Sequence, residues 1–525
     1  MTGLNKKIVV FIDDGINSRR FETGPLEFDI EITPELEVIE RKDYDQTLAN
    51  HGSGCGAIFK KYAPDAPLAS IKILNDLNQS RSSQLVKALE WCISKPISVI
   101  NLSLGTVQPR DFAPLKKVIN TLYDHGIIVV AAANNNHQFT YPAALTNVIG
   151  VKCDCENHLQ NDEFTYDPFP LDGIDFTANS DHFLVTHLGE EKNSGESNSY
   201  AAPLITAHVY NILKREPGLS FEQVKERLIS RAVKDKPICY YPTRFVDWDH
   251  QAYLLHITDG GEQKPHLFAE DIDIIGEDKL IVGSWNRAKT DLEKWINNFI
   301  SKRTDLDTII ISTSGLNLNK SDGFTSFFDF ITHLEMNIIF LGDIPLRPEE
   351  VMTGEVMGKF WYPPDYSLLK SEPIYRPFET PAIAICDGTA KWETRVIAEL
   401  ASYFEQDLFK PLVITDSSPG VLASFNYFPW RESFGEGKDQ LLYDLNRLDL
   451  LYDPGIFLLG CQRKADDNSF FKELSRTEII DIFILIGTDI SSNGQKIHIS
   501  EKDLRQEGWA RELYNKILKL YDYST

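Results

Sequence analysis

The sequence predicts an α/β protein built on parallel β-sheets, with two such regions in one chain. In the first half, residues 126–133 form an unbroken apolar run, which is typical of a parallel strand buried on both faces. In the second half, short apolar runs alternate with amphipathic stretches of helical length. That alternation is the pattern of a parallel sheet with crossover helices.

Other elements of the first half follow from local patterns. Residues 7–12 are apolar and run into an acid, so we expect a buried strand there. Residues 99–105, VINLSLG, are expected to form another strand. A helix is expected to follow the polar turn in residues 198–203, NSYAAP. Pro203 would then lie in its first turn, where the missing N–H costs nothing.

The second half is expected to begin after about residue 235. Residues 236–270 contain prolines and a glycine pair, which favour a linker or a short β-rich connection, and a break is expected near 373–381. The expected strands are 308–312, 337–341, 382–386, 412–415, 456–459 and 482–486, and the expected helices are 291–300, 394–404 and 508–521.

Three residues with catalytic chemistry occur in a fixed order. Asp13 ends the first strand, His51 begins an HGSG segment, and Ser199 lies in the polar turn. An acid, a histidine and a serine can form a triad that activates the serine as a nucleophile. Each residue alone has an ordinary interpretation, because acids cap turns and a serine before a helix is a common N-cap. Asp14 has two interpretations, as a second assisting acid or as a solvated or capping residue.

Further motifs carry a family resemblance. Residues 131–136 read AAANNN and residues 141–143 read YPA. Subtilisin-like serine proteases have a strand ending in Ala-Ala-Ala-Gly-Asn, a following Tyr-Pro-Ala turn, an Ile-Asn-Met-Ser-Leu-Gly strand, and a triad in the order Asp, His, Ser. The chain resembles this family, the subtilases, over residues 8–210. The resemblance implies a subtilisin-like parallel-sheet catalytic domain.

The resemblance also implies site residues. Asp13, His51 and Ser199 would form the triad, and Asn135 would donate a hydrogen bond to the oxyanion that forms in acyl transfer.

Substrate-binding residues are implied in the same way. Ser103, Leu104 and Gly105 would pair their backbone with an extended peptide. Thr140 would line the pocket for the side chain before the cut, where the family often has glycine or another small residue. A modest-sized side chain is therefore expected in that pocket.

Several positions depart from the family pattern. Ser197 and Asn198 replace the usual Gly-Thr before the nucleophile, and Tyr200 replaces the following Met and is expected to narrow the site. Asn134 replaces a glycine, and asparagine tolerates left-handed backbone better than most residues. Cys55 could make the site sensitive to thiol reagents or could be a buried small residue.

The composition limits the partners. The chain has 525 residues and a net charge of −24, so basic surfaces suited to nucleic acid or anionic membranes are not expected. The charge instead favours a cationic peptide or protein substrate. No apolar run approaches the length of a membrane span.

The cysteines and the start of the chain predict a compartment. Seven scattered cysteines do not resemble a disulfide framework, and Cys153 and Cys155 lack further ligands for a zinc site. Because the chain leads almost directly into the strand at 7–12, we expect no signal peptide or pro-segment. These features predict a cytoplasmic protein, and no cofactor or metal is predicted.

One loop of the second half resembles a P-loop in outline. Lys391 follows a strand and a small-residue loop, and Asp416 ends the next strand. Ala390 and Trp392 replace the Gly and the Ser or Thr that would cradle phosphates and hold magnesium. A degenerate nucleotide-binding fold reused for partner or peptide binding is favoured over nucleotide hydrolysis. An ordinary turn between a strand and a helix remains an alternative.

The expected domains are residues 1–235 as a subtilisin-like peptidase domain, 236–270 as a linker, 271–375 as an α/β lobe and 376–525 as a degenerate P-loop-like α/β domain. The implied function is an intracellular serine endopeptidase with a specific client recruited by the C-terminal half. This organisation is similar to subtilases of bacterial peptide-maturation systems, which remove leaders from ribosomally made peptides. The alternatives are a general cytosolic subtilisin, a non-catalytic pseudoprotease scaffold that binds peptides, and a nucleotide-driven remodeller.

Overall fold

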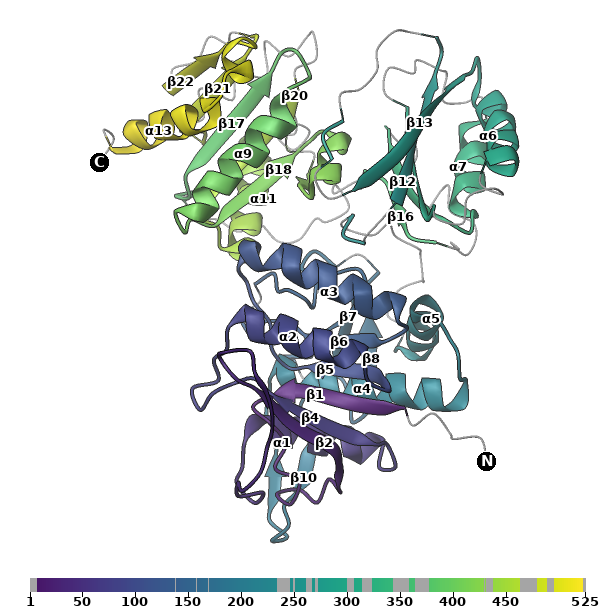
Figure 1. Cartoon of the computed structure of the whole chain (residues 1–525), viewed down its shortest axis with the longest axis vertical. Coiled ribbons are helices and arrows are strands. Elements are labelled where there is room, and N and C mark those ends of the chain that lie inside the picture. The colour runs from purple at the N-terminus through teal and green to yellow at the C-terminus, as the bar shows by residue number, and fades with distance from the viewer. Residues whose placement is uncertain are drawn as a thin grey trace. The chain divides into compact units, whose positions relative to one another are not determined.

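The chain divides into two compact units, Met1–Cys239 and Tyr240–Thr525. The structure is a computed structural model, drawn in Figure 1. The residues that it describes are 7–136, 138–156, 158–168, 170–233, 246–248, 251–260, 267–269, 272–299, 306–313, 323–342, 358–363, 377–428, 430, 438–462, 479–488 and 495–522.

The first unit is built on a nine-stranded sheet with the order β3-β2-β4-β1-β5-β6-β7-β9-β8. The strands from β2 to β9 in this order pair in parallel, while β3 and β8 pair antiparallel at the two edges. The strands are β1 Ile8–Asp13, β2 Leu26–Ile32, β3 Val38–Glu40, β4 Leu68–Lys72, β5 Ile97–Leu102, β6 Ile128–Ala132, β7 Val148–Cys153, β8 Phe164–Tyr166 and β9 Phe176–Ala178, with a separate antiparallel hairpin of β10 Phe183–Val185 and β11 Glu191–Asn193.

Helices cover the sheet of the first unit. They are α1 His51–Tyr62, α2 Ser82–Ile93, α3 Phe112–Asp124, α4 Asn198–Arg215 and α5 Phe221–Arg231, with a short 3₁₀ turn at Pro109–Asp111. Alternate strand residues point to opposite faces, and Val9 and Phe11 of β1 share one core with Phe59 of α1 and the apolar side of α4. Figure 1 shows α2 and α3 side by side against the sheet.

The carboxyl ends of β1, β5, β6 and β7 lie at one edge of this sheet. The strands are adjacent and parallel, and their register pairs Ile12 with Leu102 and Leu102 with Ala131. Residues that follow these strands are therefore brought together whatever their distance in the sequence. Catalytic residues of parallel α/β proteins commonly lie at such an edge.

The second unit contains two further sheets in which every strand pair is parallel. Their orders are β13-β12-β14-β15-β16 and β19-β18-β20-β17-β21-β22. The strands are β12 Gln251–Thr258, β13 Asp273–Ile281, β14 Thr308–Ser312, β15 Asn337–Leu341, β16 Phe360–Trp361, β17 Ala382–Asp387, β18 Pro411–Thr415, β19 Asn426–Tyr427, β20 Ile456–Gln462, β21 Ile482–Ile486 and β22 Gln495–Ile499. The helices are α6 Trp285–Phe299, α7 Phe324–Thr332, α9 Glu393–Gln406, α11 Lys438–Tyr452 and α13 Trp509–Asp522, with 3₁₀ turns at Ser418–Ala423 and Asp503–Arg505.

The structure confirms the α/β fold class and its parallel sheets. It differs from the expected domain division, because the segment 236–270 contains β12, an inner strand of the five-stranded sheet. The glycine pair and prolines that favoured a linker flank this strand, and residues 234–245, 261–266 and 371–376, near the expected boundaries, lie outside the described residues. In the described part of the chain, no helix is both long and apolar enough to cross a membrane.

The packing of Phe59 predicts a large effect on stability. Its ring is fully buried and lies 5.4 Å from the ring of Phe11, so Phe59→Ala removes apolar contacts and leaves a cavity beside β1. We expect a loss of ~3–5 kcal/mol in the free energy of unfolding of the first unit. Hydrogen exchange of β1 peptides in increasing urea measures this loss. Phe183→Ala, at a ring that is 48% exposed, is the control, and equal losses in both variants would contradict the core assignment.

Candidate active site

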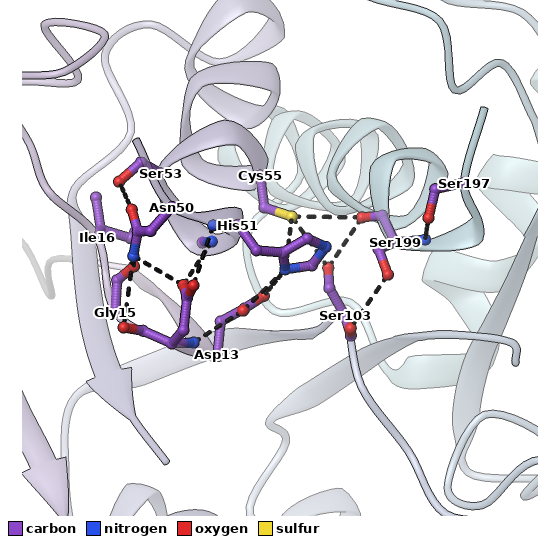
Figure 2. Close-up of polar contacts among 12 residues, drawn as sticks. Asp13, Gly15, Ile16, Asn50, His51, Ser53, Cys55, Ser103, Ser197 and Ser199 are labelled. Carbon is purple, nitrogen blue, oxygen red and sulfur yellow. Dashed lines mark hydrogen bonds and ion pairs between the residues drawn. The ribbon is translucent and has the colours of Figure 1, made fainter. Parts of the chain in front are cut away.

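Asp13 and His51 form the centre of the site. The imidazole Nδ1 lies 2.9 Å and 3.0 Å from the two carboxylate oxygens of Asp13, whose side chain is 1% exposed (Figure 2). A carboxylate only accepts hydrogen bonds, so Nδ1 carries the proton and Nε2 is left as the base. Cys55, with its sulfur 4.0 Å from Nδ1, and Asp13 raise the pKa of His51, while burial opposes them.

The start of α1 is fixed by Asp14. Its carboxylate accepts the N–H of His51 at 3.0 Å and that of Gly52 at 2.7 Å, and so caps the helix that begins at His51. A Cβ at Gly52 would lie 2.5 Å from the Gly15 carbonyl, which explains the glycine at this close approach. Burial, followed by the neighbouring Asp13, raises the pKa of Asp14. Of the two sequence interpretations, the structure favours the capping acid.

Ser199 lies in the first turn of α4, and the Cys55 sulfur lies between it and His51, at 3.5 Å from the Ser199 carbonyl and 4.0 Å from His51 Nδ1. Ser197 is the N-cap, and its hydroxyl accepts the N–H of Ser199 at 3.3 Å. The Ser199 hydroxyl donates to the Ser103 carbonyl at 3.3 Å, as Figure 2 shows. Within the described residues no hydrogen bond joins Ser199 to His51. In free enzymes such catalytic hydrogen bonds are often long or misaligned until substrate binds.

The expectation that Pro203 lies in the first turn of a helix was wrong. Helix α4 begins at Asn198, so Pro203 comes later and lacks the N–H that would bond the Ser199 carbonyl four residues back. The Ser103 hydroxyl donates to this carbonyl at 3.0 Å instead, and the Cys55 thiol does so at 3.5 Å. Side chains from the segment after β5 and from α1 thus hold the turn at Ser199, which is called the nucleophile turn below after its proposed role.

Asn135 is oriented by the residue before the nucleophile. Asn198 donates its N–H to Asn135 Oδ1 at 3.0 Å, and its side-chain amide donates to the Asn134 carbonyl at 2.9 Å. Asn198 is 2% exposed, and its own Oδ1 accepts the N–H of Cys153 at 2.7 Å. Because Asn135 Oδ1 accepts this hydrogen bond, Nδ2 is the donor atom of the same side chain. The replacement of Thr by Asn198 was visible in the sequence, but its role was not.

The proposed substrate-binding segment directly follows β5, which ends at Leu102, earlier than expected. Ser103 is buried, Leu104 half-buried and Gly105 exposed. Thr140 is buried, and a Cβ at Gly105 would lie 2.6 Å from its Cγ2 methyl, so the two segments lie in close contact.

Tyr200 packs on the imidazole, with its ring centroid 5.3 Å from that of His51. The expected narrowing of the site by Tyr200 stays a prediction. The Cys55 thiol is fully buried, and burial raises its pKa. Asp13, His51 and Cys55 are also a group of potential metal ligands in the described residues, with ligand atoms within 4.8 Å of one another.

The P-loop-like turn of the second unit surrounds a carboxylate of the chain itself, that of Asp387. Asp387, at the end of β17, accepts the N–H groups of Lys391, Trp392 and Glu393 through Oδ2, at 2.8, 2.6 and 3.1 Å. Its Oδ1 accepts the N–H of Thr389 at 2.8 Å. Backbone N–H groups in this position hold phosphate in a P-loop, so the buried carboxylate occupies the anion's place. The geometry therefore argues against a nucleotide-driven remodeller acting through this loop.

The raised pKa of His51 predicts the pH dependence of the site. A general base acts only when neutral, so the rate of Ser199 labelling by a fluorophosphonate should rise with pH, with its midpoint above the ordinary histidine value of about 6.5. Asp13→Asn should lower that midpoint and slow labelling by ~10⁴. Labelling rates measured across pH test this, with the exposed Asp76→Asn as control. A midpoint that stays in place in Asp13→Asn would contradict the assignment.

Comparisons with known proteins identify relatives of part of the chain. The profile of the subtilase family matches residues 11–266. Minor extracellular protease Epr of Bacillus subtilis (strain 168) is 26% identical over 241 residues, covering 43% of this chain and 35% of that protein. Subtilisin DY of Bacillus licheniformis is 30% identical over 187 residues, covering 34% of this chain and 65% of that protein. The chain thus spans about a third to two thirds of the length of these relatives.

Solved structures also align with part of the chain. The crystal structure of a lanthipeptide protease aligns at 16% identity, covering 44% of this chain and 82% of that chain, with a TM-score of 0.36. A cold adapted subtilisin-like serine proteinase aligns at 18% identity, covering 46% of this chain and 88% of that chain, with a TM-score of 0.35. The family match and the curated relatives thus show that residues 11–266 are similar to subtilases.

Proposed function

We propose that the protein is a serine endopeptidase that uses Asp13, His51 and Ser199. The observation that carries this proposal is the contact of His51 Nδ1 with both oxygens of the buried Asp13. His51 lies on α1, which packs against α4, the helix that carries Ser199. The similarity of residues 11–266 to subtilases supports the same chemistry.

The proposed reaction follows from the atoms at hand. Ser199 Oγ turns from the Ser103 carbonyl to His51 Nε2, gives up its proton and attacks the substrate carbonyl. Asp13 keeps the proton on Nδ1 and stabilises the imidazolium. The oxyanion is met by Asn135 Nδ2 and by the N–H of Ser199. His51 then protonates the leaving amine. In the second half of the reaction His51 takes a proton from water, the water attacks the acyl-enzyme, and the proton returns to Ser199 Oγ.

Substrate binding is proposed at the segment after β5. Backbone groups of residues 103–105 would add an extended peptide as a strand. Thr106 and Tyr141 exchange two backbone hydrogen bonds of 2.8 Å, which hold this segment against the Thr140 side. The Thr140 methyl fills space beside Gly105, so the pocket before the cut is proposed to take a small side chain.

We further infer that the substrate is one specific peptide or protein client in the cytoplasm, with leader removal from a ribosomally made peptide as the candidate reaction. The net charge of −24 favours a basic client, and the six cysteines in the described residues are free thiols. The second unit, with its two parallel sheets, is the proposed recruiting part.

A second candidate function is a pseudoprotease scaffold that binds peptides without cutting them. It is favoured by one observation. The hydroxyl and the N–H of Ser199 are both bonded within the chain, to the Ser103 carbonyl and to Ser197 Oγ. A scaffold needs neither group to be reactive, so Ser199→Ala would leave its function intact, whereas it would abolish that of a protease.

Asn135→Ala should reduce cleavage by ~10²–10³ because one oxyanion donor is lost. The rate is measured by mass spectrometry on unstructured casein and on a precursor peptide with a basic leader, with Ser199→Ala as the inactive reference. Asn136→Ala, at the exposed neighbour, is the matched control. Cleavage at one bond of the precursor supports a specific client, and equal cleavage of many casein bonds opposes it. Full activity in Asn135→Ala would contradict the proposed oxyanion role.

Thr140→Gly should enlarge the pocket and shift the preferred residue before the cut towards larger side chains. One buried methyl or methylene group changes discrimination by about 10–200-fold, so the shift should be visible in kcat/KM for a peptide series of increasing side-chain size. Thr146→Gly, at a residue of the same unit outside the proposed pocket, serves as control. An unchanged preference in Thr140→Gly would remove Thr140 from the pocket.

A further inference from the structure

Two thiols lie together at the carboxyl end of β7. Cys153 is the last residue of this strand, and its sulfur lies 3.1 Å from that of Cys155. Residues two apart on extended backbone point to the same side. Asp154, between them, is buried and accepts the N–H groups of Leu159 at 2.6 Å and Glu156 at 3.3 Å. The turn is therefore braced by Asp154 with both sulfurs on one side.

The two thiols differ in accessibility. Cys155 is exposed, so an oxidant can reach it, while Cys153 is half-buried. Burial, followed by the hydrogen bond and charge of Cys155, raises the pKa of Cys153 to about 12. Oxidation of the Cys155 sulfur removes the part of this rise in pKa that Cys155 causes. Cys153 then forms its thiolate more readily and can react as the second thiol.

A single buried side chain connects this pair to the active site. The N–H of Cys153 donates to Asn198 Oδ1 at 2.7 Å. Asn198 in turn holds Asn135 Oδ1 and the Asn134 carbonyl, and the next residue is Ser199. A shift of the Cys153 backbone is thus passed to the oxyanion donor and to the nucleophile turn.

We propose that Cys153 and Cys155 are a redox modification site, and that their disulfide slows acylation of Ser199 by displacing Asn198. The inference rests on the proposed function for its effect on rate. A disulfide needs the sulfurs at about 2.05 Å instead of 3.1 Å, and the proposal is that the backbone at the end of β7 moves with Cys153 as the bond closes. A misplacement of about 1 Å in a catalytic site can cost ~10² in rate.

The oxidant is a low-molecular-weight disulfide such as oxidised glutathione. The Cys155 thiolate attacks one of its sulfurs, a mixed disulfide forms and one glutathione thiolate leaves. The Cys153 thiolate then attacks the Cys155 sulfur, the protein disulfide forms and the second thiolate leaves. The protein loses two protons and two electrons, and the oxidant gains them as two thiols. Dithiothreitol reverses the change.

The test uses the full chain, reduced with dithiothreitol or treated with oxidised glutathione. Peptide mapping by mass spectrometry identifies the disulfide, and the rate of fluorophosphonate labelling reports on Ser199. Amide hydrogen exchange of the peptide containing residues 196–200 shows whether the disulfide disturbs the backbone around Asn198 and Ser199, and this measurement needs no catalysis. Cys155→Ser keeps every other thiol, so it is the matched control, and Cys153→Ser is a second variant.

We expect a Cys153–Cys155 disulfide, faster exchange in residues 196–200 and labelling slower by at least about tenfold, with the ~10²–10³ that loss of an oxyanion donor costs as the upper limit. Cys155→Ser should keep its labelling rate in oxidised glutathione. Absence of the disulfide, or a disulfide with unchanged exchange and labelling, would overturn the proposal. If Ser199 is unlabelled in both states, the proposed function fails, and the exchange alone decides whether the thiol pair is connected to the nucleophile turn.

Discussion

The site depends on the parallel alignment of β1, β5, β6 and β7 in one sheet. Each strand is buried on both faces, so its apolar residues fix its register against its neighbours. The residues at or just after the four carboxyl ends, Asp13, Ser103, Asn135 and Cys153, therefore share one edge. Helices α1 and α4 contact each other and bring His51 and Ser199 to the same edge through their N-terminal residues.

Unpaired backbone groups explain most of the polar residues around the triad. A helix leaves its first N–H groups without partners, and a proline removes one more donor. Asp14 caps α1 at His51, Ser197 caps α4 at Ser199, and the Ser103 hydroxyl replaces the donor that Pro203 lacks. Each of these contacts gives a backbone N–H or carbonyl group its hydrogen-bond partner and also holds a proposed catalytic residue in position. The same hydrogen bonds therefore stabilise the helix ends and set the geometry of the site.

The strands with the clearest apolar runs, the fold class and the candidate triad could be predicted because they depend on local apolar runs and on short motifs. For Asp14 the sequence left two interpretations open, and the choice between them depends on how closely the start of α1 approaches the end of β1. The roles of Asn198 and Asp387 were beyond the sequence, because their partners are set by three-dimensional neighbours. The strand β12 was missed because the flanking prolines and glycines dominate the pattern of its segment.

The most direct test of the account is the intact mass of the protein after incubation with a fluorophosphonate, beside that of its Ser199→Ala form. The arrangement of Asp13, His51 and the nucleophile turn predicts one covalent adduct on the wild type and none on the variant. An unmodified wild type, or an equal adduct on both forms, would contradict an activated Ser199.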